Sequence, residues 1–369
     1  MKKTLALLLA LLMLFSLAAC GTAEPTPAPA VTEQPAATEA PAEEPAAETV
    51  IFTDSSGREV ELPANITKIA PGGTVATMIL AAFAPEKLVC VGTDLNENQI
   101  PYLYDGIAEL PVTGQLYGGK ATLNLEELLA TGAEVIIDLG DFKSSIADDL
   151  TALQEQTGLP CVFIEADLAH MADAFRSLGA ILGKEERGEK LAGLAEETMT
   201  MAAENRAKIS EEEMISVLYS SGADPLGTNA EGSSQAQVLG IIGAKNAVVV
   251  EDVSSKGGGN MINMEQLYNF DPDVILVTDA AALEIIETEA AWQELRAVQS
   301  GEVYTVPCDL YCWMSAPPSM NMILGVWWLG NLLYPEVYDY DMTAKAQEIY
   351  KTLWNYDLTA EEAAAMLRK

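Results

Sequence analysis

Few residues in this sequence carry side chains suited to catalysis or to metal binding. The chain of 369 residues has one histidine, His170, and five cysteines, of which Cys308 and Cys312 lie close together. A single imidazole excludes a zinc, nickel or manganese site that uses several histidines, and a Ser-His-Asp triad would depend on His170. Because His170 lies in a stretch with the pattern of an amphipathic helix, we expect an exposed or core position for it. The sequence therefore predicts no catalytic residue, no metal site and no cofactor.

The cysteines fit structural positions. Cys90 and Cys161 lie inside apolar runs, which is typical of buried strand residues. Cys308 and Cys312 could form a disulfide outside the cytoplasm or remain two free thiols, and their spacing does not match a CxxC metal site. The sequence leaves both alternatives for this pair open.

Acidic residues far outnumber basic ones. There are 55 Asp and Glu against 20 Lys and Arg, which gives a formal net charge of -35 at pH 7. Affinity for nucleic acid depends on basic side chains that neutralise phosphates, so this charge argues against nucleic-acid binding as a main role. A hydrophobic content of 49% over this length is enough for two domains with apolar cores.

The N-terminus has the layout of an export signal. Two lysines precede an apolar run at residues 5–17, which is too short to span a bilayer comfortably. The segment LAACG at residues 17–21 resembles the lipobox of bacterial lipoproteins, in which the cysteine is lipid-modified and becomes the new N-terminus. We expect residues 1–19 to be a signal peptide that is removed, and Cys20 to carry the lipid.

Residues 20–49 consist mostly of Pro, Ala, Thr and Glu. Such a composition cannot bury enough apolar surface to offset chain entropy. We expect a disordered tether that holds the folded part at the outer face of the cytoplasmic membrane, on the extracellular or periplasmic side.

From residue 50 onward, short apolar runs alternate with helical patterns. The runs fall at residues 88–93, 134–138, 160–165, 214–220, 247–252, 273–278 and 302–306. Strands that alternate with helices predict βαβ units and mainly parallel sheets. Residues 184–210 lack proline and have apolar residues at helical spacing, which predicts one long helix. We expect an α/β fold with two Rossmann-like lobes, at residues 50–183 and 211–369, joined by this helix.

An internal repeat links the two expected lobes. Residues 123–137 (LNLEELLATGAEVII) align without gaps on residues 262–276 (INMEQLYNFDPDVIL). Each copy predicts a short helix, a turn and a buried strand, because Asn followed three residues later by Glu or Gln is a capping-box pattern. This places Glu126 and Glu265 at equivalent exposed positions in the first helical turn. Two similar lobes joined by one helix enclose a cleft in which a ligand can bind.

These features occur together in a known family. The sequence resembles the substrate-binding lipoproteins of ABC importers, the class III periplasmic binding proteins, which bind iron-siderophores, haem or cobalamin between two α/β lobes joined by one long helix. The resemblance covers residues 50 to about 335 and includes the segments FTDSSGREVELP (52–63), GTVATMIL (73–80), LVCVG (88–92) and PPSMNMILGVWWL (317–329). It implies a monomer that captures a metal chelate and delivers it to an ABC permease dimer with its ATPase.

The resemblance also implies a role for the two repeated glutamates. In that family one glutamate on each lobe docks into arginine-lined pockets of the permease, and the matching positions here are Glu126 and Glu265. Two carboxylates on separate lobes suit such a contact, because charge-assisted pairs with arginine fix orientation. The alternative is that both acids only complement a helix dipole.

We expect the ligand in the cleft, where helix starts meet the loops that follow the strands. The ligand-binding candidates combine aromatic rings, which offer contact area at low entropic cost, with polar and cationic groups: Thr74, Tyr117, Phe142, Lys143, Asn229, Tyr311 and Trp313. The cations in these loops are Lys120, Lys143 and Lys256, too few for a highly anionic chelate. A neutral or cationic planar ligand fits better, such as a corrinoid, a haem-like ring or a weakly charged siderophore.

Two other classes of function remain open. A surface enzyme, such as a carboxylate-dependent hydrolase, would need Glu126 and Glu265 to face one cleft about 5 to 9 Å apart. A lipoprotein sensor would have the same fold but no importer. The sequence names neither the ligand nor the partner importer.

Overall fold

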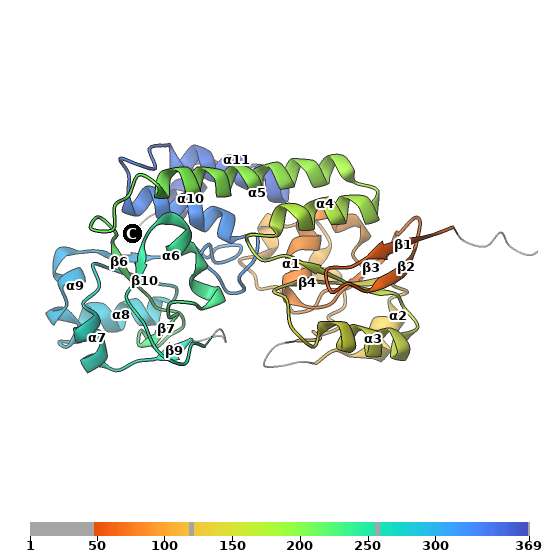
Figure 1. Ribbon diagram of the computed structural model, residues 1–369, viewed down its shortest axis with the longest axis horizontal. Coiled ribbons are helices and arrows are strands. Elements are labelled where there is room, and N and C mark those ends of the chain that lie inside the picture. The colour runs from red at the N-terminus through yellow and green to blue at the C-terminus, as the bar shows by residue number, and fades with distance from the viewer. Residues whose placement is uncertain (1–47, 118–121, 255–258, 368–369) are drawn as a thin grey trace, which may run out of the picture. The chain divides into compact units, whose positions relative to one another are not determined.

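The computed structural model describes residues 48–117, 122–254 and 259–367 and has a mixed α/β fold built around two parallel sheets (Figure 1). This confirms the expected fold class. The expected signal peptide, nearly all of the tether and Cys20 lie outside the described residues. No helix within those three ranges combines the length and apolarity that a membrane crossing requires.

The N-terminal lobe is built on a three-stranded parallel sheet. Its strands lie in the order β3 (Ile69–Pro71), β4 (Val135–Gly140) and β5 (Cys161–Glu165). Every residue of β4 is buried, because a central strand is covered on both faces. The helices of this lobe are α1 (Thr74–Phe83), α2 (Leu125–Ala130), α3 (Ile146–Thr157) and α4 (Met171–Leu182). An antiparallel hairpin precedes the sheet and consists of β1 (Thr49–Thr53) and β2 (Glu59–Pro63).

The C-terminal lobe has a four-stranded sheet in which all pairs are parallel. The order is β11 (Val303–Thr305), β10 (Val274–Val277), β6 (Ser216–Tyr219) and β8 (Lys245–Asn246). A short antiparallel pair consists of β7 (Gly227–Thr228) and β9 (Asn260–Met261). The helices are α6 (Gln237–Ile242), α7 (Met264–Phe270), α8 (Ala280–Thr288) and α9 (Arg296–Ser300). Short 3-10 helices in the two lobes are η1 (Pro85–Lys87), η2 (Ile100–Tyr102), η3 (Ile107–Glu109), η4 (Ser234–Ala236) and η5 (Trp292–Glu294).

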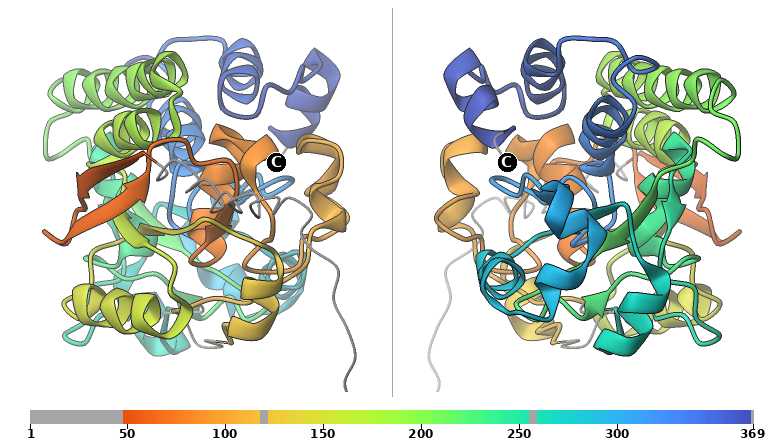
Figure 2. Two further views of the ribbon diagram at one scale, coloured as in Figure 1. Left: turned by 90° about the vertical axis from the view of Figure 1, so that its right-hand side faces the viewer. Right: turned by 90° about the vertical axis from the view of Figure 1, so that its left-hand side faces the viewer.

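One long helix, α5 (Glu185–Arg206), connects the two groups of strands, within the range predicted for it. It has 22 residues, which corresponds to a length of about 33 Å. It packs against α4, α6, α10 (Met322–Leu333) and α11 (Met342–Trp354). Figures 1 and 2 show α11 on the same side of the molecule as α5. The last helix, α12 (Ala360–Met366), packs on α11. The described chain forms one compact unit, so the lobe limits given above stay predictions.

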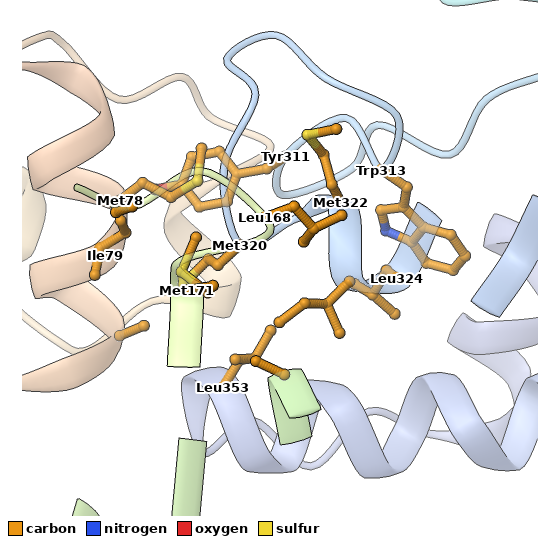
Figure 3. Packing of buried hydrophobic residues seen from close by; sticks show 14 of the residues in the cluster. Met78, Ile79, Leu168, Met171, Tyr311, Trp313, Met320, Met322, Leu324 and Leu353 are labelled. Carbon is orange, nitrogen blue, oxygen red and sulfur yellow. The ribbon is translucent and has the colours of Figure 1, made fainter. Parts of the chain in front are cut away.

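A continuous apolar cluster joins elements of both lobes. It contains Met78 of α1, Met171 of α4, Met322 and Leu324 of α10 and Leu353 of α11 (Figure 3). All of these side chains are buried. This shared core holds the N-terminal lobe and the C-terminal helices together.

Two of the strand predictions are wrong. Residues 88–93 form only isolated bridges, from Leu88 to Ile69 and from Val91 to Val112. The segment 247–252 is not a strand; the strand β8 ends at Asn246, just before it. Val249 of this segment is 61% exposed. Both segments are apolar runs, and an apolar run by itself does not distinguish a paired strand from a connection that packs on the core.

Candidate ligand-binding site

A pocket of about 330 Å³ lies between the two lobes, at the carboxyl ends of β3 and β4. The N-terminal lobe contributes Gly72, Gly73, Thr74, Val75, Gln115, Tyr117, Asp138, Leu139, Gly140, Asp141 and Lys143. The C-terminal lobe contributes Ser234, Gln235, Pro317 and Pro318. The carboxyl end of a parallel sheet, beside a helix start, is the usual place for a ligand in an α/β fold.

Two larger hollows have less of the character of a ligand site. One, of about 680 Å³, is lined by residues of the C-terminal lobe with the end of α5. The other, of about 740 Å³, lies where the ends of α1, α5 and α11 meet. The first touches the parallel sheet only at its edge strand β8 and the second touches no strand, whereas the 330 Å³ pocket lies at the carboxyl ends of β3 and β4 and is lined by both lobes. We therefore take the 330 Å³ pocket as the candidate site.

Glycine allows the floor of the pocket to form. The chain passes from β3 through Gly72 and Gly73 into α1, which begins at Thr74. A Cβ atom on Gly72 would lie 2.6 Å from Oδ1 of Asp138, so only glycine permits this approach of the turn to β4. The hydroxyl of Thr74 donates to Oε1 of Gln115 at 2.9 Å. These contacts place the positive end of the α1 dipole at the pocket wall.

Asp138 is a buried carboxylate at the pocket. Its residue is 5% exposed, and no other side chain among the described residues donates a hydrogen bond to it. Burial raises the pKa of Asp138 to about 6, although the charge of Lys143 and the backbone N–H of Leu139 both oppose the rise. A ligand that brings a positive charge or a hydrogen-bond donor to Asp138 would offset the free-energy cost of burying this carboxylate.

Tyr117 and Lys143 form the other polar wall. The Nζ atom of Lys143 lies 4.5 Å from the centroid of the Tyr117 ring, and the Tyr117 hydroxyl donates to Oδ2 of Asp149 at 2.8 Å. Burial, followed by the bond to Asp149, raises the pKa of Tyr117, so the phenol stays neutral. Burial also raises the pKa of Asp141, which lies near Lys143. Among the described residues, the lining therefore contains two carboxylates and one ammonium group. Lys120 and Lys256, the other two cations expected in these loops, lie outside the described residues.

The structure brings together three of the seven expected ligand-binding residues. Thr74, Tyr117 and Lys143 line the pocket. Phe142 precedes Lys143 in sequence, but it is 52% exposed, its ring lies against Phe163 at a centroid distance of 6.3 Å, and it is outside the lining. Asn229 is 1% exposed and also lies outside the lining. Its side-chain amide has no hydrogen-bond partner among the described residues.

Tyr311 and Trp313 are in the core instead of the pocket wall. Their residues are 6% and 0% exposed, and the rings pack against Trp354 and Trp328 respectively (Figure 3 shows the core around them). The loop that carries them is covered by α10 and α11, and large rings contribute most to stability when they are buried there. We therefore do not retain these two residues as ligand contacts.

Sequence reasoning missed part of the lining. Asp138 had one signal, since it is the single charged residue in a strand that is otherwise apolar. Ser234 and Gln235 lie five and six residues after the candidate Asn229, and Pro317 and Pro318 begin the segment 317–329 that carries part of the resemblance. Gln115 had no signal at all, because only the fold places it against Thr74.

The two repeated glutamates are exposed and lie in the first turns of α2 and α7. Oδ1 of Asn124 accepts from the N–H of Glu127 at 3.2 Å, and Asn263 forms a complete capping box with Gln266. The predicted N-caps are thus confirmed. Neither Glu126 nor Glu265 is among the described residues that line the 330 Å³ pocket. The two carboxylates therefore do not face each other across this pocket.

His170, at the start of α4, is close to two carboxylates. Its Nδ1 atom lies 2.7 Å from Oδ1 of Asp167 and 3.8 Å from Oε1 of Glu165. One ligand atom from each of the three residues falls within 4.8 Å of the others, a grouping that could hold a metal ion. The group is outside the lining of the pocket. The imidazole already bonds to Asp167, which accounts for its position without an ion.

We expect His170 to titrate at a higher pH than an ordinary histidine. The hydrogen bond to Asp167 raises its pKa, with smaller contributions from Glu165 and Asp173. The bond therefore stabilises the fold below the unfolded-state pKa, and this contribution is lost as the pH rises through the folded-state pKa. Since the chain has one histidine, an NMR titration of the imidazole measures it directly. Asp167→Asn should lower the pKa clearly and Asp173→Asn only slightly; a wild-type pKa at or below the ordinary value would contradict the geometry.

The four cysteines in the described part of the chain are free thiols. Cys161 lies in β5, as predicted, whereas Cys90 is buried but outside the strands. Cys308 is exposed and Cys312 is buried, and their thiols are close enough to hydrogen-bond. This hydrogen bond is the main reason that the pKa of the Cys312 thiol is lowered and the pKa of the Cys308 thiol is raised.

Two parallel α/β lobes, one long connecting helix and a pocket between the lobes define a two-lobe ligand-binding protein. Residues 75–310 match the family described as periplasmic binding protein, and the chain belongs to this family. It is an ABC transporter substrate-binding protein of the class III type, as the resemblance implied.

The chain is similar to several proteins of this kind. It is 24% identical over 296 residues to the ABC transporter substrate-binding lipoprotein YvrC of Bacillus subtilis (strain 168). The aligned region covers 78% of this chain and 87% of YvrC. It is 23% identical over 199 residues to the Fe(3+)-citrate-binding protein YfmC of the same organism, covering 53% of this chain and 60% of YfmC. An ABC transporter solute binding protein from Sulfurospirillum deleyianum DSM 6946 superposes with a TM-score of 0.78 at 27% identity, over 86% of this chain and 98% of that one.

Proposed function

We propose that this protein is a lipoprotein, anchored through Cys20 at the outer face of the cytoplasmic membrane, that captures a metal chelate or corrinoid and delivers it to an ABC permease with its ATPase. The observation that carries the proposal is the pocket of about 330 Å³, which is lined by residues of both lobes. Membership of the family supports the importer, and the names of the relatives YvrC and YfmC support the lipid anchor and an iron chelate.

The charge of the pocket favours a neutral or cationic ligand. Among the described lining residues, Asp138 and Asp141 bring two carboxylates against the one ammonium group of Lys143. A trianionic chelate would lie against two carboxylates with only Lys143, among the described lining residues, to offset its charge, whereas a cationic or donor-bearing ligand would pair with the buried Asp138. The volume is at the low end of the range for ligand pockets, which suits a compact chelate or one portion of a larger molecule.

An enzyme and a sensor are the alternatives to a transport function. A hydrolase with Glu126 and Glu265 as its acid pair loses support, because neither lines the pocket. The relatives are named as binding proteins, which also favours a non-enzymatic role. A sensor would bind the same ligand, so reconstituted transport with a permease separates it from the importer component. We propose that the protein acts as a monomer.

The ligand class is tested by calorimetric titration of the mature protein at pH 7.5. The probes are cyanocobalamin, haemin, ferric citrate, the cationic hydroxamate chelate ferrioxamine B and a trianionic catecholate chelate, with free Ni²⁺ and Zn²⁺ as metal controls. Mass spectrometry of protein purified from its native host adds any ligand that remains bound. We expect a neutral or cationic chelate to bind and the trianionic chelate and free ions to bind weakly. Tight binding of the trianionic chelate alone would contradict the charge argument.

For a cationic ligand, binding should depend on Asp138 and on pH. The pKa of Asp138 is about 6, so its charge is present at pH 7.5 and disappears as the pH falls through that value. Affinity should therefore decrease below pH 6, and Asp138→Asn should lower affinity at pH 7.5 about tenfold or more and flatten the profile. Glu126→Gln, which removes one carboxylate outside the pocket, is the matched control and should change neither. An unaltered profile in Asp138→Asn would exclude Asp138 as a ligand contact.

A further inference from the structure

The two copies of the repeat are alike on their surfaces as well as in their cores. From Asn124 to Ala130 and from Asn263 to Asn269, the pattern of exposed, half-buried and buried residues is the same at every position. The N-cap asparagine and the buried leucine at the fifth position, Leu128 or Leu267, are needed for the helix and its packing. These positions are explained by the fold.

Two repeated surface positions are not required for the helices to pack on the core. The first holds Glu126 or Glu265, and neither carboxylate forms a hydrogen bond or an ion pair with the described residues. The second, three residues further on, holds Leu129 or Tyr268, which are 44% and 42% exposed. A single exposed apolar side chain is ordinary on a protein surface. Here, however, a large apolar side chain recurs at the same position beside the same glutamate in both copies, although Leu128 or Leu267 already anchors each helix to the core.

Each glutamate shares a helix face with its apolar neighbour, because residues three apart on a helix are adjacent on its surface. The Tyr268 hydroxyl donates to the carbonyl of Ala291 at 2.8 Å, which holds the ring in place instead of leaving it free to rotate. The ring is thus pre-ordered, so little conformational entropy would be lost on contact with a partner. Figures 1 and 2 show α2 and α7 on the side of the molecule opposite α5.

We propose that Leu129 and Tyr268 are docking residues for the permease, each forming with the neighbouring glutamate one half of a two-point contact. This rests on the proposed importer function. Each half-site combines a carboxylate with an apolar side chain one turn along α2 or α7. The complementary surface has a cationic group beside an apolar one, and it must occur twice, because the half-site occurs twice in this chain. A membrane protein with two copies of the same subunit satisfies that requirement.

The charge and apolarity of the half-sites act together. The net charge of -35 makes this protein approach a basic surface readily. An apolar side chain beside an ion pair excludes water from it and so strengthens the pair. Of the exposed large hydrophobic residues in the described part of the chain, Leu129 and Tyr268 occupy equivalent positions in the repeat, whereas Ile100 and Met261 lie outside its helices.

The test uses the mature protein and its cognate permease–ATPase complex in lipid nanodiscs, with ATP hydrolysis measured against the concentration of binding protein. Leu129→Ala/Tyr268→Ala should raise the half-saturating concentration about a hundredfold, about tenfold for each side chain. Leu129→Met/Tyr268→Phe, which keeps the apolar surface, should restore most of the affinity. Ile100→Ala/Met261→Ala is the control for loss of exposed apolar area elsewhere and should have no effect. Ligand affinity should be the same in all variants.

The outcomes separate this inference from the proposed function. If Glu126→Ala/Glu265→Ala abolishes stimulation but Leu129→Ala/Tyr268→Ala does not alter it, the apolar contact is wrong and the importer function stands. If neither pair has an effect, both the docking assignment and this inference fail. Light scattering over a range of concentrations tests whether these residues instead join two copies of this chain. A wild-type dimer that Leu129→Ala/Tyr268→Ala converts to a monomer would show such self-association and would overturn the proposal.

Discussion

Glu126→Ala/Glu265→Ala is expected to reduce ligand uptake about a hundredfold or more while leaving ligand affinity unchanged. Both carboxylates are exposed, lie outside the pocket lining and have no partner within the described residues. When such an acid docks against arginine, its removal leaves a desolvated cation unpaired, and each such loss is costly. Transport assays in proteoliposomes, together with calorimetric ligand titrations of the same preparations, measure the two quantities separately.

The matched control for that double variant is Glu155→Ala/Glu287→Ala, which removes one exposed carboxylate from α3 and one from α8. It should transport like the wild type, because the change in net charge is the same but the docking positions are intact. A parallel loss of ligand binding and transport in Glu126→Ala/Glu265→Ala would contradict the docking assignment and return these residues to the binding site.

The second large effect concerns membrane attachment. With Cys20→Ala the mature protein should be found almost entirely in the soluble fraction, because the single lipid anchor is lost and the excess of acidic residues, a net charge of -35 over the full sequence, disfavours adsorption to anionic membranes. Cell fractionation with immunoblotting measures this, and mass spectrometry of the N-terminal peptide identifies the lipid. Cys308→Ala, which removes an exposed cysteine of the folded part, should stay with the membrane. A processed Cys20→Ala protein that still fractionates with membranes would show that another segment anchors the chain.

The local patterns of the sequence were sufficient for the fold class. Alternating apolar runs and helical spacing predicted two parallel sheets, and the repeat predicted the N-caps at Asn124 and Asn263. These features depend on residues close together in the chain, namely the cap, the buried leucine and the following strand. Where an apolar run packs as a connection, as at residues 88–93, the same local signal gave a wrong strand.

The ligand site was only partly accessible from the sequence. Thr74, Tyr117 and Lys143 follow or precede strands and helices at the carboxyl edge of the sheet, so the general rule for α/β folds was enough to find them. The rule does not say which residues of more distant loops meet that edge. Ser234, Gln235, Pro317 and Pro318 join the pocket only because the C-terminal lobe lies against the N-terminal one.

The sequence by itself determined the charge, the fold class, the duplicated helix-and-strand unit and the two repeated glutamates, because each depends on composition or on neighbours within a few residues. Only the tertiary structure decided that Tyr311 and Trp313 belong to the core and Asp138 to the pocket. The physical reason is that aromatic rings and carboxylates are found both in cores and at ligand sites, and what separates the two is the packing of segments far apart in the chain. For Trp313 that packing is provided by Trp328, and for Asp138 by Gly72, which leaves the carboxylate buried at the edge of a cavity.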